Sequence, residues 1–75
     1  MFDQVAEIVA QVLDVDVETL TPETDFVKDL MADSLDRVEI MMRLEDEFSI
    51  SIPDDVAAEI NTIGDIVERL QGLND

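Results

Sequence analysis

The stretch DSLDRVEIMMRLEDEF, residues 33–48, predicts a helix that begins at about Ser34 and ends at about Phe48. Asp33 and Ser34 both have side chains that can cap its N-terminus. Residues placed about 100° apart around this helix form two apolar stripes in nearly opposite sectors. The first stripe is Ile40, Met41, Leu44 and Phe48, and the second is Leu35, Val38 and Met42. Since a helix in a small bundle buries one stripe, the second stripe is either a further buried contact or an exposed docking patch.

Carboxylates edge the second stripe, because Glu39 and Asp46 lie beside it and Glu45 lies just beyond it. An apolar strip with acidic margins is typical of a recognition surface for a basic, grooved partner. The alternative is that the long segment 14–33 folds over the strip and buries it, and the spacing does not decide between the two. Arg37 points toward the core sector, and we expect its stem to pack while its charge reaches solvent.

Helical spacing continues on both sides of this stretch. Residues 3–13 and about 54–60 predict two more helices, and Thr62 with Asp65 three residues later predicts the capped start of a fourth. The apolar positions of that fourth helix are Ile63, Ile66, Val67 and Leu70. Gly72 lies beyond them and suits a helix terminator.

The connection over residues 14–33 is long, which in a compact domain indicates function. Within it, Thr21 and Pro22 could begin one helical turn, with Thr21 as the N-cap. We therefore expect an all-α fold, a small four-helix bundle with three longer helices and a short third helix. The long loop joins helices one and two, and residues 1–75 are expected to form a single domain.

Acidic residues outnumber basic ones by 20 to 4 and give the chain a formal net charge of −16. Nucleic acid and anionic membrane surfaces are therefore not expected as partners, because binding to either needs clustered Lys and Arg. A basic protein is the natural complement, and the negative field should speed its encounter with the chain. A plainer interpretation, in which the acidity only keeps the protein soluble, stays open on charge alone.

Cysteine and histidine are both absent from the chain. The first absence removes disulfides, thiolate metal sites and a protein thiol nucleophile, and the second removes the usual base near neutral pH. No Ser-His-Asp triad can form, so we expect neither an enzyme nor a metal site. No apolar run is long enough to span a membrane, and residues 1–4 lack the basic start of a signal peptide, so a cytoplasmic location is expected.

Residues 26–39, FVKDLMADSLDRVE, closely resemble the phosphopantetheine attachment motif of acyl carrier proteins. The similarity continues through LEDEF at 44–48 and IPD at 52–54, and it ends with INTIGD at 60–65. It covers essentially the whole chain, and it is similar above all to the free-standing bacterial carriers of fatty acid synthesis.

The resemblance implies that Ser34 receives 4′-phosphopantetheine from coenzyme A, and that the thiol of this arm holds acyl groups as thioesters. The implied partners are a phosphopantetheinyl transferase (holo-acyl-carrier-protein synthase) and the ketoacyl synthases, reductases, dehydratases and acyltransferases of fatty acid synthesis. The chain is expected to be a monomer. Positions that match partner contacts of the family are Asp33, Leu35, Asp36, Val38, Glu39, Met42 and Asp46. Positions that match residues near the prosthetic group are Ile52, Ala57 and Ile60.

Three positions depart from the family pattern. Asp14 and Met31 stand where relatives usually have Gly, and Ala58 stands where they often have an acidic residue. Asp14 can take a left-handed cap conformation at some cost. Met31 adds an exposed apolar side chain beside Ser34, which puts the loop conformation there in question.

Other interpretations stay open. The chain could be an acidic mimic of nucleic acid or an inhibitor of a basic enzyme, with Ser34 as a plain N-cap. Asp14, Asp16 and Glu18 alternate as in a calcium loop, but the Gly and the final bidentate Glu of an EF-hand are missing. A carrier of polyketide, peptidyl or alanyl intermediates would share the chemistry at Ser34.

Overall fold

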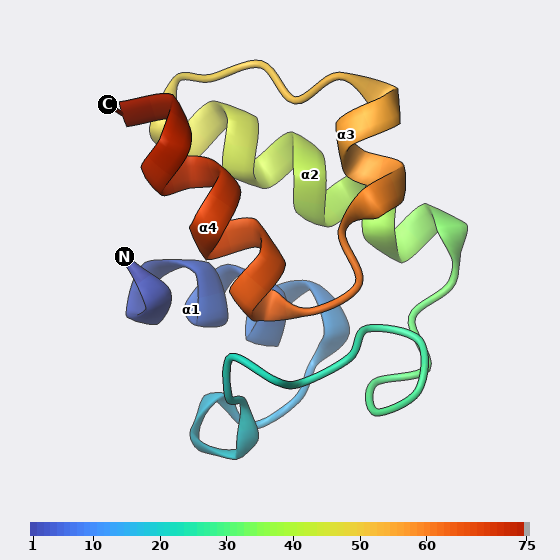
Figure 1. The fold of residues 1–75 in the computed structure, drawn as a ribbon. Helices are drawn as coiled ribbons and strands as arrows, with labels where there is room; N and C mark the ends of the chain where they lie inside the picture. The colour runs from blue at the N-terminus through green and yellow to red at the C-terminus, as the bar shows by residue number, and fades with distance from the viewer. Residues whose placement is uncertain (75) are drawn as a thin grey trace.

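The computed structural model describes residues 1–74, with side chains described up to Gly72, and the regular elements of that part are all helical. They are α1 (Phe2–Leu13), the 3₁₀ turn η1 (Val17–Thr19), α2 (Ser34–Phe48), α3 (Asp54–Glu59) and α4 (Ile63–Asn74). Figure 1 shows α1, α2 and α4 around a common centre, with the short α3 beside the first half of α2. The expected fold, three longer helices and a short third one, is confirmed.

The core lies where the three longer helices meet, and each contributes a buried triplet at helical spacing. The triplets are Val5, Ala6 and Val9 from α1, Ile40, Met41 and Leu44 from α2, and Ile63, Ile66 and Leu70 from α4. Phe26, from the loop between α1 and α2, closes one side of this aliphatic core. Full burial of a Val, Leu, Ile, Met or Phe side chain contributes roughly 1.5–3 kcal/mol before the entropy of ordering is subtracted. The first stripe of α2 is therefore the one that faces the core.

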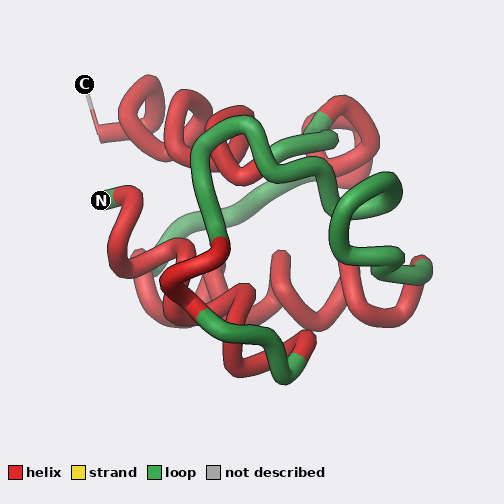
Figure 2. Tube along the Cα trace, turned by 90° about the horizontal axis from the view of Figure 1, so that it is seen from below, coloured by secondary structure: helices red, strands yellow, loops and turns green. Residues whose placement is uncertain are grey.

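Backbone hydrogen bonds tie the loop between α1 and α2 to the junction of α3 and α4. The N–H of Phe26 donates to the Asn61 carbonyl at 2.9 Å, and the N–H of Gly64 donates to the Pro22 carbonyl at 2.8 Å. Figure 2 shows this loop as a long connection that is interrupted by one short helical turn. The loop leaves the second stripe of α2 exposed, so the alternative in which it buries that stripe is wrong.

The helical turn expected at Thr21 and Pro22 lies earlier in the loop, at Val17–Thr19. Asp16 caps this turn, because its Oδ1 accepts the backbone N–H of Glu18 at 2.9 Å. An Asp at the N-cap offers the same acceptor that Thr21 was expected to offer, and its position three residues before the last helical residue suits a single turn. Residues 22–23 form only an isolated hydrogen-bonded turn.

The start of α4 agrees with the prediction, whereas its end does not. Thr62 and Asp65 form the expected reciprocal cap, since the N–H of Asp65 donates to Thr62 Oγ1 and the N–H of Thr62 donates to Asp65 Oδ2, both at 3.1 Å. The helix then continues through Gly72 to Asn74. Gly72 has no positive φ, and a glycine ends a helix only where the chain turns left-handed.

Three residues other than glycine have a positive φ in the described part of the chain: Asp14 at 56°, Met31 at 54° and Ser49 at 54°. Asp14 and Ser49 end α1 and α2, respectively. Met31 lies two residues before the N-cap of α2. Two of these three are the positions at which the sequence replaces the expected Gly, so the left-handed backbone is kept without glycine.

Candidate functional site

Asp33 is the N-cap of α2, and Ser34 is the first residue of the helix. Asp33 Oδ1 accepts the N–H of Asp36 at 2.9 Å, and Asp36 Oδ2 accepts the N–H of Asp33 at 3.3 Å. This reciprocal cap takes over the task that a serine N-cap would perform. The interpretation of Ser34 as a plain N-cap is therefore wrong.

The Ser34 side chain is exposed, and none of its atoms forms a hydrogen bond with another residue of the described chain. A hydroxyl in this position can take up a covalent group without losing a structural contact. A freely bound phosphate would fit less well, because the carboxylates of Asp33 and Asp36 lie in the same helical turn. The residues at the start of α2 thus fit an arm that is bonded to the serine oxygen.

Asp25 organises the loop that leads to this turn. Its Oδ1 accepts the backbone N–H groups of Val27 and Lys28, both at 2.9 Å, and its own N–H donates to Asp29 Oδ2 at 2.8 Å. The hydrogen bond from the Lys28 N–H, with that from Val27 and the charges of Lys28 and Arg37, lowers the pKa of Asp25 below its ordinary value against an opposing effect of partial burial. The carboxylate therefore stays ionised and holds the turn in shape.

The second stripe of α2 is an exposed strip beside Ser34, made of Leu35, Val38 and Met42. Leu35 is 79% exposed, Met42 62% and Val38 54%, so the described residues leave more than half of each of these apolar side chains uncovered. Its acidic neighbours Glu39 and Asp46 are exposed as well. We refer to these five residues as the α2 strip, and its exposure leaves the docking patch as the remaining interpretation of the second stripe.

Two more exposed apolar side chains, Val27 and Met31, precede α2. The exposure of Met31 agrees with the expectation from the sequence. The exposure of Val27 could not be predicted from the sequence. Val27 directly follows another apolar residue, Phe26, and nothing in the local pattern shows which of the two side chains points into the core.

A groove of about 330 Å³ runs between α2 and α3 and has Ser34 on its edge. Two of the three residues expected near the prosthetic group, Ile52 and Ala57, line it together with Arg37. We call it the α2–α3 groove. The third, Ile60, is 1% exposed and packs in the core, so the structure does not place it on the surface with the others.

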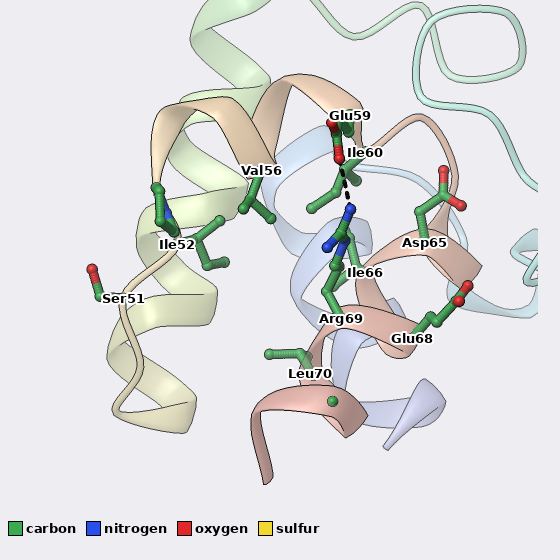
Figure 3. Close-up of a pocket in the computed structure, with 12 residues that line it drawn as sticks. Ser51, Ile52, Val56, Glu59, Ile60, Asp65, Ile66, Glu68, Arg69 and Leu70 are labelled. Atoms are coloured by element: carbon green, nitrogen blue, oxygen red, sulfur yellow. Dashed lines mark hydrogen bonds and ion pairs between the residues drawn. The ribbon is translucent and has the colours of Figure 1, made fainter. Parts of the chain in front are cut away.

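A second hollow, the α3–α4 cleft, lies on the other side of α3 and has a volume of about 500 Å³. Figure 3 shows apolar side chains of α3 and α4 facing into it, with Glu59 and Arg69 paired across its edge. The Arg69 Nη2 to Glu59 Oε2 distance is 2.6 Å. The apolar lining residues are Ile52, Val56, Ile60, Ile66 and Leu70. The short α3 therefore separates two hollows.

The sequence suggested that the charge of Arg37 reaches solvent, but its guanidinium instead binds backbone carbonyls of α3 and the residue after it. Its Nη2 donates to the Ile60 carbonyl at 2.7 Å and to the Ala57 carbonyl at 3.2 Å. The Ala57 carbonyl also accepts the Ile60 N–H, whereas carbonyls at and just past a helix end commonly need a partner from outside, which a guanidinium supplies well. Spacing along α2 could not reveal this contact, because both acceptors belong to the backbone 20 or more residues away.

No group of three acidic side chains in residues 1–74 is arranged to hold a metal ion. The calcium-loop interpretation has no geometric support, since Asp16 is engaged as the cap of η1. Within the same part of the chain, no helix combines the length and the apolar character needed to cross a membrane.

Comparison with known proteins places this site in a family. Residues 3–70 match the model of the phosphopantetheine attachment site. The chain is 51% identical to an acyl carrier protein of Picosynechococcus sp. over 67 residues, which cover 89% of this chain and 83% of the relative. It is 46% identical to an acyl carrier protein of Helicobacter pylori strain J99 over 71 residues, or 95% of this chain and 91% of the relative.

A solved structure gives the same result at the level of the fold. It is a candidate acyl carrier protein from Mycobacterium tuberculosis, with a TM-score of 0.88 and 28% sequence identity. The superposition covers 97% of this chain and 99% of the other. The chain therefore belongs to the acyl carrier proteins, the non-catalytic proteins that hold acyl groups on a phosphopantetheine arm.

Proposed function

We propose that Ser34 carries the phosphopantetheine arm and that the chain, as one domain over residues 1–75, delivers acyl intermediates to the enzymes of fatty acid synthesis. One observation carries the assignment of the residue: the Ser34 side chain is exposed, makes no hydrogen bond with the described residues, and begins α2 next to the α2 strip. The reciprocal cap of Asp33 and Asp36 keeps this turn formed without help from the serine.

Attachment needs an external enzyme, because nothing near Ser34 can act as its base. The chain has no histidine, and the carboxylates of Asp33 and Asp36 accept backbone N–H groups in the cap. In the transfer, the serine oxygen bonds to the phosphorus that bears pantetheine, the pyrophosphate P–O bond of coenzyme A breaks, and adenosine 3′,5′-bisphosphate leaves. The serine proton passes to a base of the transferase. Once attached, the arm supplies the thiol on which acyl groups are held as thioesters.

The α2 strip is the proposed docking surface for the phosphopantetheinyl transferase and for the synthases, reductases, dehydratases and acyltransferases of the pathway. Leu35, Val38 and Met42 offer apolar area that is already exposed, and Glu39 and Asp46 offer charges for a basic rim on the partner. Opposite charges steer the encounter, whereas the apolar centre supplies affinity. Asp33 and Asp36 extend the negative margin to the modified residue.

Modification in vitro tests the assignment of Ser34. Incubation with coenzyme A and a phosphopantetheinyl transferase should add the mass of one phosphopantetheine group, which peptide mapping should locate on Ser34. Ser34→Ala should gain nothing, whereas Ser51→Ala, which alters an exposed serine after α2, should be modified like the parent. A modified Ser34→Ala variant or an unmodified parent chain would contradict the proposal.

A monomer in the cytoplasm that serves fatty acid synthesis is the context we propose, on the strength of the named relatives and the acidic margin of α2. Sedimentation equilibrium of the modified chain should give the mass of one copy. Purified fatty acid synthases should elongate acyl groups on the arm at a higher rate than peptide or polyketide synthases do. The reverse order of rates would favour a carrier of another pathway.

A further inference from the structure

The helix α3 is held in place by few contacts of its own. It has six residues, none of them is buried, and its N-cap residue Pro53 offers no side-chain hydrogen bond. An isolated helix of this length is unstable in water, so its position depends on contacts made from outside. The buried Ile60 follows its last turn and provides one such anchor.

Arg37 of α2 provides the second anchor. Its guanidinium bridges the Ala57 and Ile60 carbonyls, at 3.2 and 2.7 Å, at the C-terminal end of α3. Charged donors make stronger hydrogen bonds than neutral ones, and the planar guanidinium can serve two acceptors from one nitrogen. The contact joins the first half of α2 to the C-terminal end of α3, whereas the other hydrogen bond from α2 to this region, between Glu45 and the Ile52 N–H, lies before the start of α3.

The other charged contact of α3 is weaker. Arg69 of α4 pairs with Glu59, but the two side chains are 51% and 68% exposed. Exposed ion pairs contribute little to stability, because water screens them and both side chains lose conformational freedom. Arg37 is half-buried, so its bonds to the backbone are the stronger restraint.

Arg37 also borders the modification site. It lies three residues after Ser34, on the same side of α2, and both residues line the α2–α3 groove opposite Ala57 and Asp54. One side chain thus connects the turn that bears Ser34 with the wall of the groove beside it. If the contact is lost, α3 keeps its exposed ion pair, the anchor at Ile60, the partial packing of Val56 and Ala57 against the core, and, just before its first turn, the hydrogen bond from the Ile52 N–H to Glu45 Oε2.

We propose that Arg37 is a positioning residue: it fixes α3 against α2, and it thereby presents α3 and the α2–α3 groove to partner enzymes in a defined place beside Ser34. This inference rests on the proposed function for its consequence on transfer, but the anchoring itself is independent of modification. Removal of the guanidinium releases α3 locally and leaves the core of α1, α2 and α4 closed.

Hydrogen exchange on the unmodified chain tests the anchoring. In Arg37→Met, the amide of Ile60, which donates to the Ala57 carbonyl, and that of Ala57, which donates to Pro53, should exchange roughly tenfold faster or more. Core amides of α1 should change far less. Arg43→Met is the matched control, since it removes the same charge from the exposed side of α2 and should leave α3 unchanged. Wild-type exchange of α3 in Arg37→Met, or equal acceleration of α3 and core, would overturn the proposal.

Transfer kinetics test the consequence for partners. With coenzyme A and a phosphopantetheinyl transferase, Arg37→Met should raise the KM for the carrier several-fold relative to Arg43→Met and leave kcat nearly unchanged, because Ser34 and its cap are intact. Arg37→Lys, whose single ammonium makes a poorer bridge, should lie between Arg37→Met and the parent. Equal KM values for Arg37→Met and Arg43→Met would refute the positioning role. Failure of the parent chain to be modified would instead refute the proposed function.

Discussion

Met31 keeps a left-handed backbone conformation although its side chain is 84% exposed and gains no packing in return. For an L-residue other than glycine, this conformation costs about 1–2 kcal/mol. The cost is smaller for Asp14, because a short polar side chain can form local hydrogen bonds. Asp14 ends α1, as the sequence suggested. Packing against the described residues therefore does not offset the strain at Met31, which lies three residues before Ser34.

Met31→Gly should raise the free energy of unfolding by roughly 0.5–1 kcal/mol, since the relief of strain exceeds the extra entropy of the unfolded chain. Urea denaturation at neutral pH measures this difference. Met31→Ala is the matched control, because it removes the exposed side chain and keeps the Cβ that causes the strain. A gain in Met31→Ala equal to that in Met31→Gly would show that the backbone is not the cause.

Asp65 stabilises the start of α4 only while it is ionised. Hydrogen bonds from the Asn61 and Thr62 N–H groups, at 2.9 and 3.1 Å, reach its Oδ2. The Asn61 bond is the main cause that lowers the pKa of Asp65 below its ordinary 3.8, with partial burial opposing it and Thr62 and Arg69 adding to it. A lowered folded-state pKa means that this stabilisation is complete above the unfolded value and is lost as the pH falls through the folded one.

Asp65→Asn should therefore lower the free energy of unfolding by roughly 0.5–1 kcal/mol near neutral pH. The difference from the parent should shrink as the pH falls below 3.8. Urea denaturation at several pH values measures it, with Asp3→Asn, which removes a charge from the first turn of α1, as the control. A difference that stays constant into the acid range would show that the ionised carboxylate is not what holds the helix start.

At the scale of elements, α4 is seated by a close approach of its first turn to the loop. A Cβ built on Gly64 would lie 2.8 Å from the Pro22 carbonyl oxygen, which is the same oxygen that accepts the Gly64 N–H. Real Cβ atoms do not tolerate that distance to backbone. Gly72, eight residues later in the same helix, has open space around its Cα.

Gly64→Ala should lower the free energy of unfolding by about 1–3 kcal/mol, because the loop must move away from α4. Gly72→Ala should be neutral or stabilising by up to roughly 1 kcal/mol, since Ala favours the helix and meets nothing. Thermal unfolding followed by circular dichroism compares the pair. If both variants were equally stable, the close contact between Pro22 and α4 would not contribute to the stability of the fold.

Sequence pattern predicted the helices well where apolar periodicity and capping chemistry agree. The bounds of α2 and the reciprocal cap at Thr62 and Asp65 are confirmed, because both depend on residues that are close in sequence. The end of α4 was missed at Gly72, since glycine is compatible with a helix and only the backbone conformation decides.

The sequence predicted some parts of the candidate site and missed others. The attachment motif around Ser34 was found from its resemblance to the family, and the two stripes of α2 from spacing. Whether the second stripe faces solvent depends on the path of the loop 14–33. Backbone hydrogen bonds to Asn61 and Gly64 set that path, and backbone hydrogen bonds between distant residues cannot be read from the spacing of side chains in the sequence. The hydrogen bonds of Arg37 to the end of α3 could not be predicted for the same reason.

At the scale of the whole molecule, charge opposes folding. The net charge is −16 on a chain whose described part measures 29 × 23 × 19 Å, and only two ion pairs, Glu39 with Arg43 and Glu59 with Arg69, occur among the residues that the structure describes. Like charges at such density repel and destabilise the compact state. The same field favours basic partners, so the acidity that serves docking reduces stability.

Millimolar magnesium or calcium should therefore raise the melting temperature more than sodium chloride of equal ionic strength. Divalent ions screen and bind dense carboxylates more effectively than monovalent ones, and no dedicated metal site is needed. Differential scanning calorimetry compares the two salts. Identical melting temperatures would show that charge repulsion does not limit the stability of the folded chain.

The most direct test of the account is tandem mass spectrometry of the protein isolated from the cell that makes it. We predict that the peptide containing Ser34 carries phosphopantetheine on the serine oxygen, with fatty acyl groups on the thiol in part of the population. Recovery of that peptide with the serine unmodified throughout, or with the arm on another residue, would contradict the central claim.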